Sequence, residues 1–332
     1  MSPPTISIIG AGGWGTALAL VMARRGSEVT IWGHDPAQVA LIDRTRANEK
    51  YLSGIEIPSS VRFTASLSEC SHAGVIFVVV PSRHLSEVAS DLASAGVIEG
   101  GLVVSCTKGI EEQRGLLMSE ILAEKLPTST VAVLSGPNLA GEIARGIPAA
   151  GVIGCLEEEP RNRLLGLFEG TRFRAYSSGD VRGIQLGGAL KNIFAIAAGI
   201  SDGLGLGENA RAALVTRSLA EMTRLGVAMG GRRETFQGLS GIGDLMVTCF
   251  SSRSRNHQVG FRLGQGESPD AIRSSMTMVA EGIPTATSAQ GCARRLGVET
   301  PIIDEVVSLL HAEKSASEGM HALLSRELRS EE

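Results

Sequence analysis

The first half of the chain alternates short apolar runs with longer stretches of helical periodicity. The apolar runs contain few polar positions, which is typical of strands that helices cover on both faces of a parallel sheet. The series therefore predicts a doubly wound α/β domain. We expect strands at residues 5–10, 28–32, 74–80, 101–106 and 130–136, and helices at residues 14–25, 36–47, 82–95, 115–126 and 139–145.

After about residue 175 the strand-like runs disappear and helical patterns take over. These patterns cover residues 181–198, 210–228 and 302–312, and clusters of glycine separate them. A chain of 332 residues is also long for a single hydrophobic core. We therefore expect two domains, the doubly wound one over residues 1–177 and an all-helical one over residues 178–332.

Composition narrows the class of protein and the compartment. Hydrophobic residues at 43% and charged residues at 20% exclude a disordered chain, and the scattered charges, with a net value of -4, predict neither a nucleic-acid nor a membrane partner. No signal peptide is indicated, and no apolar stretch approaches the roughly 20 residues that cross a bilayer. The cysteines are odd in number and widely spaced, so we expect a reduced, cytoplasmic location and no metal site: Cys70, Cys106, Cys155, Cys249 and Cys292.

A glycine motif lies between the first predicted strand and the first predicted helix. In SIIGAGGWGTALA, the spacing G-x-G-x-x-G is filled by Gly10, Gly12 and Gly15. The first glycine permits a tight turn, the second lets the backbone approach a pyrophosphate, and the third allows close packing of helix on sheet. This context predicts a Rossmann-like dinucleotide-binding domain, with a merely structural turn as the alternative.

The end of the second strand bears on the choice of cofactor. An acidic residue that binds the ribose hydroxyls is expected there, but Gly33 occupies the position and His34 and Asp35 follow. The missing acid removes repulsion against a 2'-phosphate, which His34 could bind, so NADP or the use of both cofactors is slightly favoured over NAD alone. Asp35 could bind a ribose or cap the helix that begins at Pro36.

Polar residues follow two later strands at the edge where ligands of such sheets bind. Lys108 comes after residues 101–106, and Gly136 and Asn138 come after residues 130–136. A lysine and an asparagine on neighbouring strand ends indicate a binding site. A solvated lysine is the alternative.

The helical half contains an unusual lysine. Lys191 lies in LGGALKNIFAIAAGISDG, where almost every other residue is apolar or small, and Asn192 is its neighbour. Gly187 and Gly188 remove side chains from the preceding turn, so that a ligand ring could approach. A lysine that extends its amine to solvent is the alternative.

Two further segments supply polar groups. Asp244 and Thr248 follow a glycine run, and an aspartate near Lys191 would hold the amine and keep it charged. Ser254, Arg255 and Asn256 precede a short helix, and such a group suits a dianionic phosphate. The alternatives are a helix cap for Asp244 and a solvated basic loop for the second group.

Over nearly the whole chain these motifs resemble the bacterial type of NAD(P)-dependent glycerol-3-phosphate dehydrogenases. The most specific match is QLGGALKNIFAIAAGISDGLGLGENARAAL, and GAGGWGTALA, WGHDP, VVVPS, TKGI, SGPN, GLSGIGDLMVTC and SRN occur in the family's order. The resemblance implies reversible reduction of dihydroxyacetone phosphate to sn-glycerol 3-phosphate, which feeds phospholipid synthesis. It leaves the assembly open, with a homodimer as one candidate.

The resemblance also implies roles for individual residues. Lys191 corresponds to the catalytic lysine with Asp244 beside it, and Lys108 to a substrate lysine that also reaches the cofactor. Arg255 and Asn256 correspond to the phosphate-binding pair. The chain departs from the family where Ile283 and Pro284 stand in place of an aromatic and a basic residue. The positions that match nucleotide contacts are Gly13, Trp14, His34, Ala140, Arg255, Val279 and Glu281.

We expect Lys191 to donate a proton to the alkoxide that forms when hydride reaches the C2 carbonyl. Ketone reduction needs the protonated amine, which an adjacent Asp244 favours. One alternative is a dehydrogenase for other β-hydroxy acids or acyl thioesters, although such enzymes favour a histidine that the lysine helix lacks. The other is a non-catalytic nucleotide sensor, which would not need Lys108, Lys191 and Arg255 together.

Overall fold

The computed structural model of the protein describes residues 5–276 and 279–327. The chain divides into two compact units. The first comprises residues 1–108 and 116–185, and the second comprises residues 109–115 and 186–332. Each unit is described by itself.

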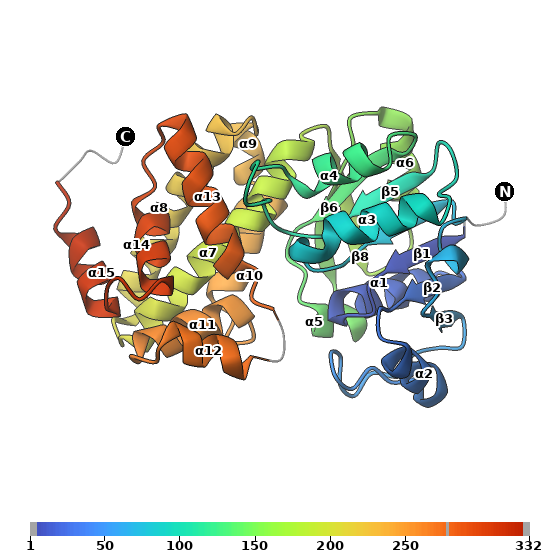
Figure 1. Ribbon diagram of the computed structural model, residues 1–332, viewed down its shortest axis with the longest axis horizontal. Helices are drawn as coiled ribbons and strands as arrows, with labels where there is room; N and C mark the ends of the chain where they lie inside the picture. The colour runs from blue at the N-terminus through green and yellow to red at the C-terminus, as the bar shows by residue number, and fades with distance from the viewer. Residues whose placement is uncertain (1–4, 277–278, 328–332) are drawn as a thin grey trace. The chain divides into compact units, whose positions relative to one another are not determined.

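The first unit is built on one eight-stranded sheet with the order β3-β2-β1-β4-β5-β6-β7-β8. All neighbouring strands are parallel except β6 and β7, which are antiparallel. The order reverses between β1 and β4, as in a doubly wound sheet. Figure 1 shows β1, β2 and β3 on one side of the sheet and β5 and β6 on the other. The strands are β1 (Ile6–Ile9), β2 (Val29–Trp32), β3 (Val61–Thr64), β4 (Val75–Val78), β5 (Leu102–Ser105), β6 (Thr130–Ser135), β7 (Ala149–Gly154) and β8 (Phe173–Ser178).

The five predicted strands are confirmed as β1, β2, β4, β5 and β6, but three strands were not predicted. In β3 and β8 exposed residues interrupt the apolar run, and β7 is rich in alanine and glycine, which have low strand propensity. The five predicted strands are parallel to one another, as expected. The unpredicted strand β7 runs antiparallel to β6, and Ser135 pairs with Val152 across them.

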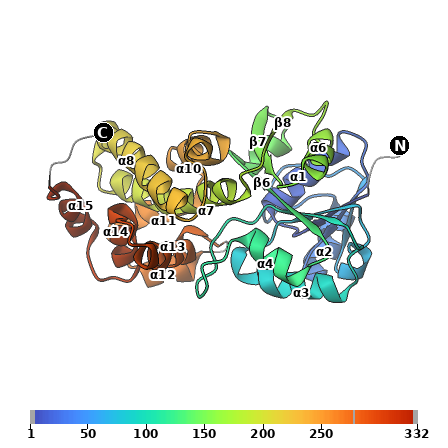
Figure 2. The ribbon, with the colours of Figure 1, turned by 90° about the horizontal axis from the view of Figure 1, so that it is seen from above.

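Helices cover both faces of this sheet. One core cluster joins the sheet to α1, α2, α5 and α6, and a second joins it to α3 and α4, which lie side by side on the other face (Figure 2). The helices are α1 (Gly13–Ala23), α2 (Pro36–Thr45), α3 (Leu85–Ser94), α4 (Met118–Lys125), α5 (Ala140–Ala144) and α6 (Glu158–Gly166), with the short turns η1 (Leu67–Glu69) and η2 (Ser82–His84).

The secondary-structure elements in the described part of the second unit are all helices or helical turns. Its first helix is α7 (Val181–Gly203), which begins in the first unit and belongs to the second from residue 186 onward. The other helices are α8 (Gly207–Ala228), α9 (Arg233–Phe236), α10 (Asp244–Cys249), α11 (Arg255–Gly264), α12 (Pro269–Ser275), α13 (Gly282–Leu296), α14 (Pro301–Leu310) and α15 (Ala316–Leu324), with the π-helical turn η3 (Leu239–Gly243) before α10.

Glycines let α7 and α11 pack with their backbones in contact. A Cβ atom on Gly199 would lie 2.0 Å from the carbonyl oxygen of His257, and one on Gly260 would lie 1.9 Å from that of Ile196. No side chain fits in either place, so these glycines are required by the packing and not by a turn. The contact fixes α11 against the helix that carries Lys191.

A buried carboxylate from α8 caps the start of α14. Glu221 is 2% exposed and accepts hydrogen bonds from the backbone N–H groups of Ile302 (3.1 Å) and Ile303 (2.9 Å). Burial raises the pKa of Glu221 to about 7, because the two backbone donors only partly offset the loss of water. The second unit therefore contains a titratable helix cap.

The expectation that no apolar stretch is long enough to cross a membrane is wrong for α7. Among the described residues, this 23-residue helix alone is long and apolar enough to cross a membrane, with a mean hydropathy of 1.3. All of its apolar stretch is buried inside the folded protein, so the same composition serves a core helix.

Candidate active site

The glycine motif forms the turn between β1 and α1. Gly10 has a φ of +131°, and a Cβ atom there would lie 2.5 Å from the carbonyl oxygen of Val79. A Cβ atom on Gly15 would lie 2.0 Å from the carbonyl oxygen of Gly10, whereas one on Gly12 would have no heavy atom within 4 Å. The fold thus requires Gly10 and Gly15, and the open side of Gly12 is where a ligand could approach the backbone.

The start of α1 suits an anion. Gly12 occupies the N-cap position without a side chain to cap the helix, and the first turn carries no acidic residue. The first N–H groups of a helix have no acceptor within it and carry a partial positive charge. These residues fit the pyrophosphate of a dinucleotide.

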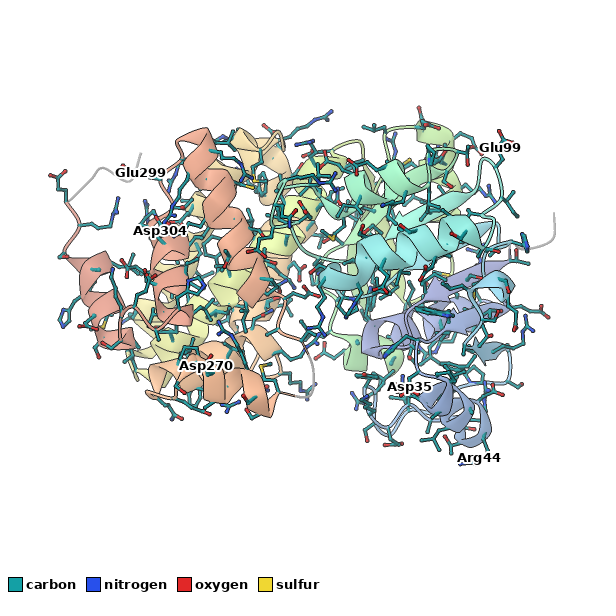
Figure 3. The ribbon with its side chains drawn as sticks, viewed as in Figure 1. Asp35, Arg44, Glu99, Asp270, Glu299 and Asp304 are labelled. Carbon is teal, nitrogen blue, oxygen red and sulfur yellow. The ribbon has the colours of Figure 1, made fainter. Side chains whose placement is uncertain are left out.

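At the end of β2 the structure shows the capping role that was one of the two interpretations of Asp35. Its side chain caps α2 by accepting hydrogen bonds from the N–H groups of Ala37 (3.0 Å) and Gln38 (3.2 Å), at the position labelled in Figure 3. A Cβ atom on Gly33 would lie 2.7 Å from Val39, so the usual acidic side chain has no room there. His34, the remaining candidate in this turn, is exposed.

The two strand-end sites predicted in the first unit lie together. The amine of Lys108 donates a hydrogen bond to the carbonyl oxygen of Gly136 (3.3 Å). Gly136 has a φ of +136°, and a Cβ atom there would lie 2.9 Å from the Cα atom of Gly151, so this glycine is required where β6 and β7 meet. Both amide atoms of Asn138 are buried without a hydrogen-bond partner in the part of the chain that the structure describes.

Two nucleotide positions implied by the resemblance lie beside the glycine turn. Ala140 begins α5, and its Cβ atom lies 3.8 Å from where a Cβ atom on Gly13 would be. The ring of Trp14 packs against Phe173, with ring centres 6.3 Å apart. Trp14 therefore contributes to the core of the first unit.

In the second unit Lys191 and Asp244 form a buried ion pair. Lys191 is 7% exposed and Asp244 is fully buried, and the amine donates hydrogen bonds to Asp244 Oδ1 and to Thr248 Oγ1, the latter at 2.7 Å. The Thr248 hydroxyl donates to the backbone oxygen of Asp244 (2.6 Å), which leaves its lone pairs for the amine. A carboxylate in contact stabilises the ammonium form of a lysine. The interpretation of Lys191 as a solvated side chain is therefore wrong.

Gly187 has a different role from the one expected. A Cβ atom there would lie 2.3 Å from the backbone oxygen of Ser240, so the turn η3, not a ligand ring, fills this space. This close approach brings α10, and with it Asp244, against α7. Gly187 thus helps to place Asp244 beside Lys191 and does not itself line a ligand site.

The predicted phosphate-binding residues lie at the start of α11. Ser254 caps this helix by accepting from the N–H of His257 (3.3 Å), and Arg255 donates to the backbone oxygen of Val279 (2.8 Å). The buried Asn256 donates to Asn192 Oδ1 (2.9 Å). The predicted polar residues of the second unit therefore come from three helices: Lys191 and Asn192 from α7, Asp244 from α10, and Arg255 and Asn256 from the start of α11.

The segment with Val279 and Glu281 leads into α13. Glu281 is the N-cap residue, and the N–H of Gly282 donates to Asn256 Oδ1 (2.9 Å). Pro284, which departs from the family pattern, lies in the first turn of α13, where its missing N–H has no intrahelical acceptor to lose. The departure is therefore compatible with the helix.

Sequence reasoning missed one residue that contacts the glycine turn from another segment. The buried side chain of Asn48 donates hydrogen bonds to Ala11 and Thr16. No motif spacing indicates it, because Asn48 lies in the irregular segment after α2.

The chain combines a dinucleotide-type glycine turn on a doubly wound sheet with a buried lysine–aspartate pair. This combination is typical of pyridine-nucleotide dehydrogenases. Family models described as the N-terminal and C-terminal parts of NAD-dependent glycerol-3-phosphate dehydrogenase match residues 5–160 and 180–321. The chain belongs to the NAD-dependent glycerol-3-phosphate dehydrogenase family.

Individual relatives agree with this assignment. A glycerol-3-phosphate dehydrogenase (NAD(P)+) of Parvibaculum lavamentivorans is 43% identical over 98% of both chains, and one of Nitratidesulfovibrio vulgaris is 44% identical over 98% of this chain and 99% of the relative. The crystal structure of glycerol-3-phosphate dehydrogenase from Coxiella burnetii has a TM-score of 0.93 and 36% identity, covering 97% of this chain and 99% of that one.

These comparisons confirm the predicted fold class and the predicted class of enzyme, an oxidoreductase that uses NAD or NADP. A ketopantoate reductase of Ralstonia eutropha has a TM-score of 0.63 at 19% identity, covering 96% of this chain and all of that one, which shows a shared fold alone. The hypothesis of a non-catalytic sensor is not supported.

Proposed function

We propose that the chain reduces dihydroxyacetone phosphate reversibly to sn-glycerol 3-phosphate with NADH or NADPH and so supplies glycerophospholipid synthesis. The observation that carries this proposal is the buried ion pair of Lys191 and Asp244 in a chain of this family. A buried charged amine is costly without a partner, and here it has one that keeps it protonated.

The residues of the glycine turn would hold the cofactor. The backbone of Gly10, Gly12, Gly13, Trp14 and Gly15 would bind the pyrophosphate at the start of α1. The reduced nicotinamide supplies a hydride when it is bound. The other residues proposed to contact the cofactor are His34, Lys108, Ala140, Arg255, Val279 and Glu281.

Lys191 would donate a proton to the C2 oxygen of the substrate as the ketone becomes an alcohol. The carboxylate of Asp244 and the hydroxyl of Thr248 orient the amine by accepting two of its three N–H groups. The amine so oriented would donate to the substrate oxygen. Oxidation in the reverse direction returns the proton to Lys191.

The phosphate would bind at the start of α11. Ser254, Arg255 and Asn256 offer hydrogen-bond donors there, together with the first N–H groups of the helix. Binding energy from the phosphate would orient the carbonyl beside Lys191. Lys108, Gly136, Asn138 and Asn192 would complete the substrate site, and the buried amide of Asn138 supports this because a ligand would satisfy it.

We assign cofactor binding to a domain of residues 1–177 and substrate binding to residues 178–332. We infer a cytoplasmic location, because the five cysteines are buried free thiols and not disulfides. We propose a homodimer as the assembly, to be tested by light scattering.

The experiment is a comparison of initial rates with dihydroxyacetone phosphate and with unphosphorylated dihydroxyacetone, each with NADH and NADPH. We expect turnover of the phosphorylated ketone alone at low concentration. Lys191→Ala should abolish turnover while fluorescence titration still detects NADPH binding. Equal rates with both ketones would reject the phosphate site, and normal turnover of Lys191→Ala would remove Lys191 from the chemistry.

A further inference from the structure

Asn48 lies in the segment after α2 and is 1% exposed. Its side-chain Nδ2 donates hydrogen bonds to the backbone oxygen of Ala11 (3.0 Å) and to Thr16 Oγ1 (2.9 Å). Ala11 is the residue between the first two glycines of the motif, and Thr16 lies in the first turns of α1. One buried amide therefore joins the glycine turn to the helix that follows it.

The backbone around Asn48 closes on the same turn. Its carbonyl oxygen accepts hydrogen bonds from the N–H groups of Tyr51 (3.2 Å) and Leu52 (2.7 Å). The resulting turn places the carbonyl oxygen of Tyr51 2.9 Å from where a Cβ atom on Gly13 would be. The segment thus touches the glycine turn through both its side chain and its main chain.

The polar atoms of Asn48 show why packing alone does not explain this residue. Both N–H groups of its amide are used, but its Oδ1 is buried without a hydrogen-bond partner among the residues that the structure describes. An unpaired buried oxygen is unfavourable, and an apolar side chain of similar size would avoid it. The orientation of the amide is fixed because the oxygen of Ala11 can only accept.

We propose that Asn48 is a positioning residue for dinucleotide binding. It holds the peptide plane between Ala11 and Gly12 and ties it to Thr16 of α1, so that the N–H groups of the turn and of the start of α1 point toward the pyrophosphate. It acts through Ala11 and Thr16 and does not itself touch the cofactor. This inference rests on the proposed role of the glycine turn.

The test measures cofactor affinity apart from catalysis. Asn48→Asp keeps the shape but replaces two donors with a carboxylate beside the oxygen of Ala11, and Thr16→Val removes one acceptor. We expect the dissociation constants of NADH and of ADP-ribose, which share the pyrophosphate, to rise by roughly tenfold or more in Asn48→Asp, and by a smaller factor in Thr16→Val. The KM for dihydroxyacetone phosphate at saturating NADH should stay unchanged.

Controls separate positioning from loss of folding. Asn162→Asp makes the same change at an exposed position on α6 and should leave both dissociation constants unchanged. Thr16→Ser retains the hydroxyl and should restore near-normal affinity. If Asn48→Asp does not fold, as shown by thermal unfolding, the comparison of Thr16→Val with Thr16→Ser decides the question.

The outcomes distinguish this inference from the proposal on which it rests. Unchanged affinity in Asn48→Asp and Thr16→Val, with affinity lost in Gly12→Val, would overturn the role of Asn48 and leave the glycine turn as the cofactor site. Unchanged affinity in Gly12→Val as well would overturn both. An equal loss in Thr16→Val and Thr16→Ser would indicate a packing role and reject positioning through the hydrogen bond.

Discussion

Replacing Asp244 with asparagine isolates the electrostatic part of the lysine site. Asparagine has nearly the same shape and keeps a side-chain oxygen that can accept from Lys191, but it removes the negative charge. Asp244 is fully buried and Lys191 is 7% exposed, so water cannot replace the lost charge. The ammonium is then left in a buried position with a neutral hydrogen-bond partner.

The expected size of the effect follows from this burial. Breaking a buried ion pair by removing one partner costs about 3–5 kcal/mol, because the remaining charge is uncompensated. The lysine avoids this cost by losing its proton, so the amine should deprotonate at a lower pH in Asp244→Asn than in the unmodified protein.

The assay is the pH dependence of kcat for reduction of dihydroxyacetone phosphate. In the proposed mechanism reduction requires the protonated amine of Lys191, so activity should be lost as the pH rises and this amine deprotonates. The basic limb of the profile should move to lower pH in Asp244→Asn. Thr248→Val, which removes a neutral contact of 2.7 Å, should move the limb less than Asp244→Asn does.

A basic limb at the same pH in Asp244→Asn and in the unmodified protein would refute this reasoning. So would an equal loss of kcat at every pH, because that result assigns Asp244 a role in placing the lysine and not in its charge. Binding of NADPH, followed by fluorescence, should be the same in both variants.

Four other substitutions test separate parts of the structure. Gly12→Ala should weaken NADPH binding at least tenfold with little change in unfolding free energy, because its Cβ atom meets nothing, whereas Gly15→Ala should destabilise the fold by at least about 2 kcal/mol. Arg255→Ala should raise the KM for dihydroxyacetone phosphate roughly 10- to 100-fold, as expected for a charged hydrogen bond, and an unchanged KM would place the phosphate elsewhere. Glu221 has a pKa of about 7 in the folded protein against 4.5 in its ordinary state, so the folded state binds more protons in this range and stability falls as the pH rises from about 4.5 to about 7. Urea unfolding should show a decline of about 3 kcal/mol across that range, and Glu221→Gln should remove it.

The sequence predicts best those features whose physical cause is local. Gly10 and Gly15 are recognisable because the turn after β1 needs a positive φ and a helix close to its own strand, and both requirements lie within a few residues. The same holds for Lys191, since an amine in an apolar helix needs a charged partner, and Asp244 was the aspartate proposed. In both cases one short segment shows that the residue is special, although the partner of Lys191 lies 53 residues further along the chain.

Features that depend on distant contacts could not be predicted from such patterns. The strands β7 and β8 belong to the sheet because β7 pairs with β6 and β8 pairs with β7. Their own residues do not indicate strands, since β7 is rich in alanine and glycine and β8 contains several exposed residues. Asn48 is an ordinary loop residue until the fold places it 3.0 Å from the oxygen of Ala11. Neither pairing leaves a periodic signal.

Gly187 shows how the two kinds of information combine in one helix. Its sequence context suggests space for a ligand, but the backbone of η3 occupies that space, and this contact is what carries Asp244 to the lysine. The glycines that join α7 to α11 likewise bring Asn256 within hydrogen-bond distance of Asn192 on α7. The glycines of α7 therefore let backbones meet, and in this way side chains from separate helices reach the amine of Lys191 and the amide of Asn192.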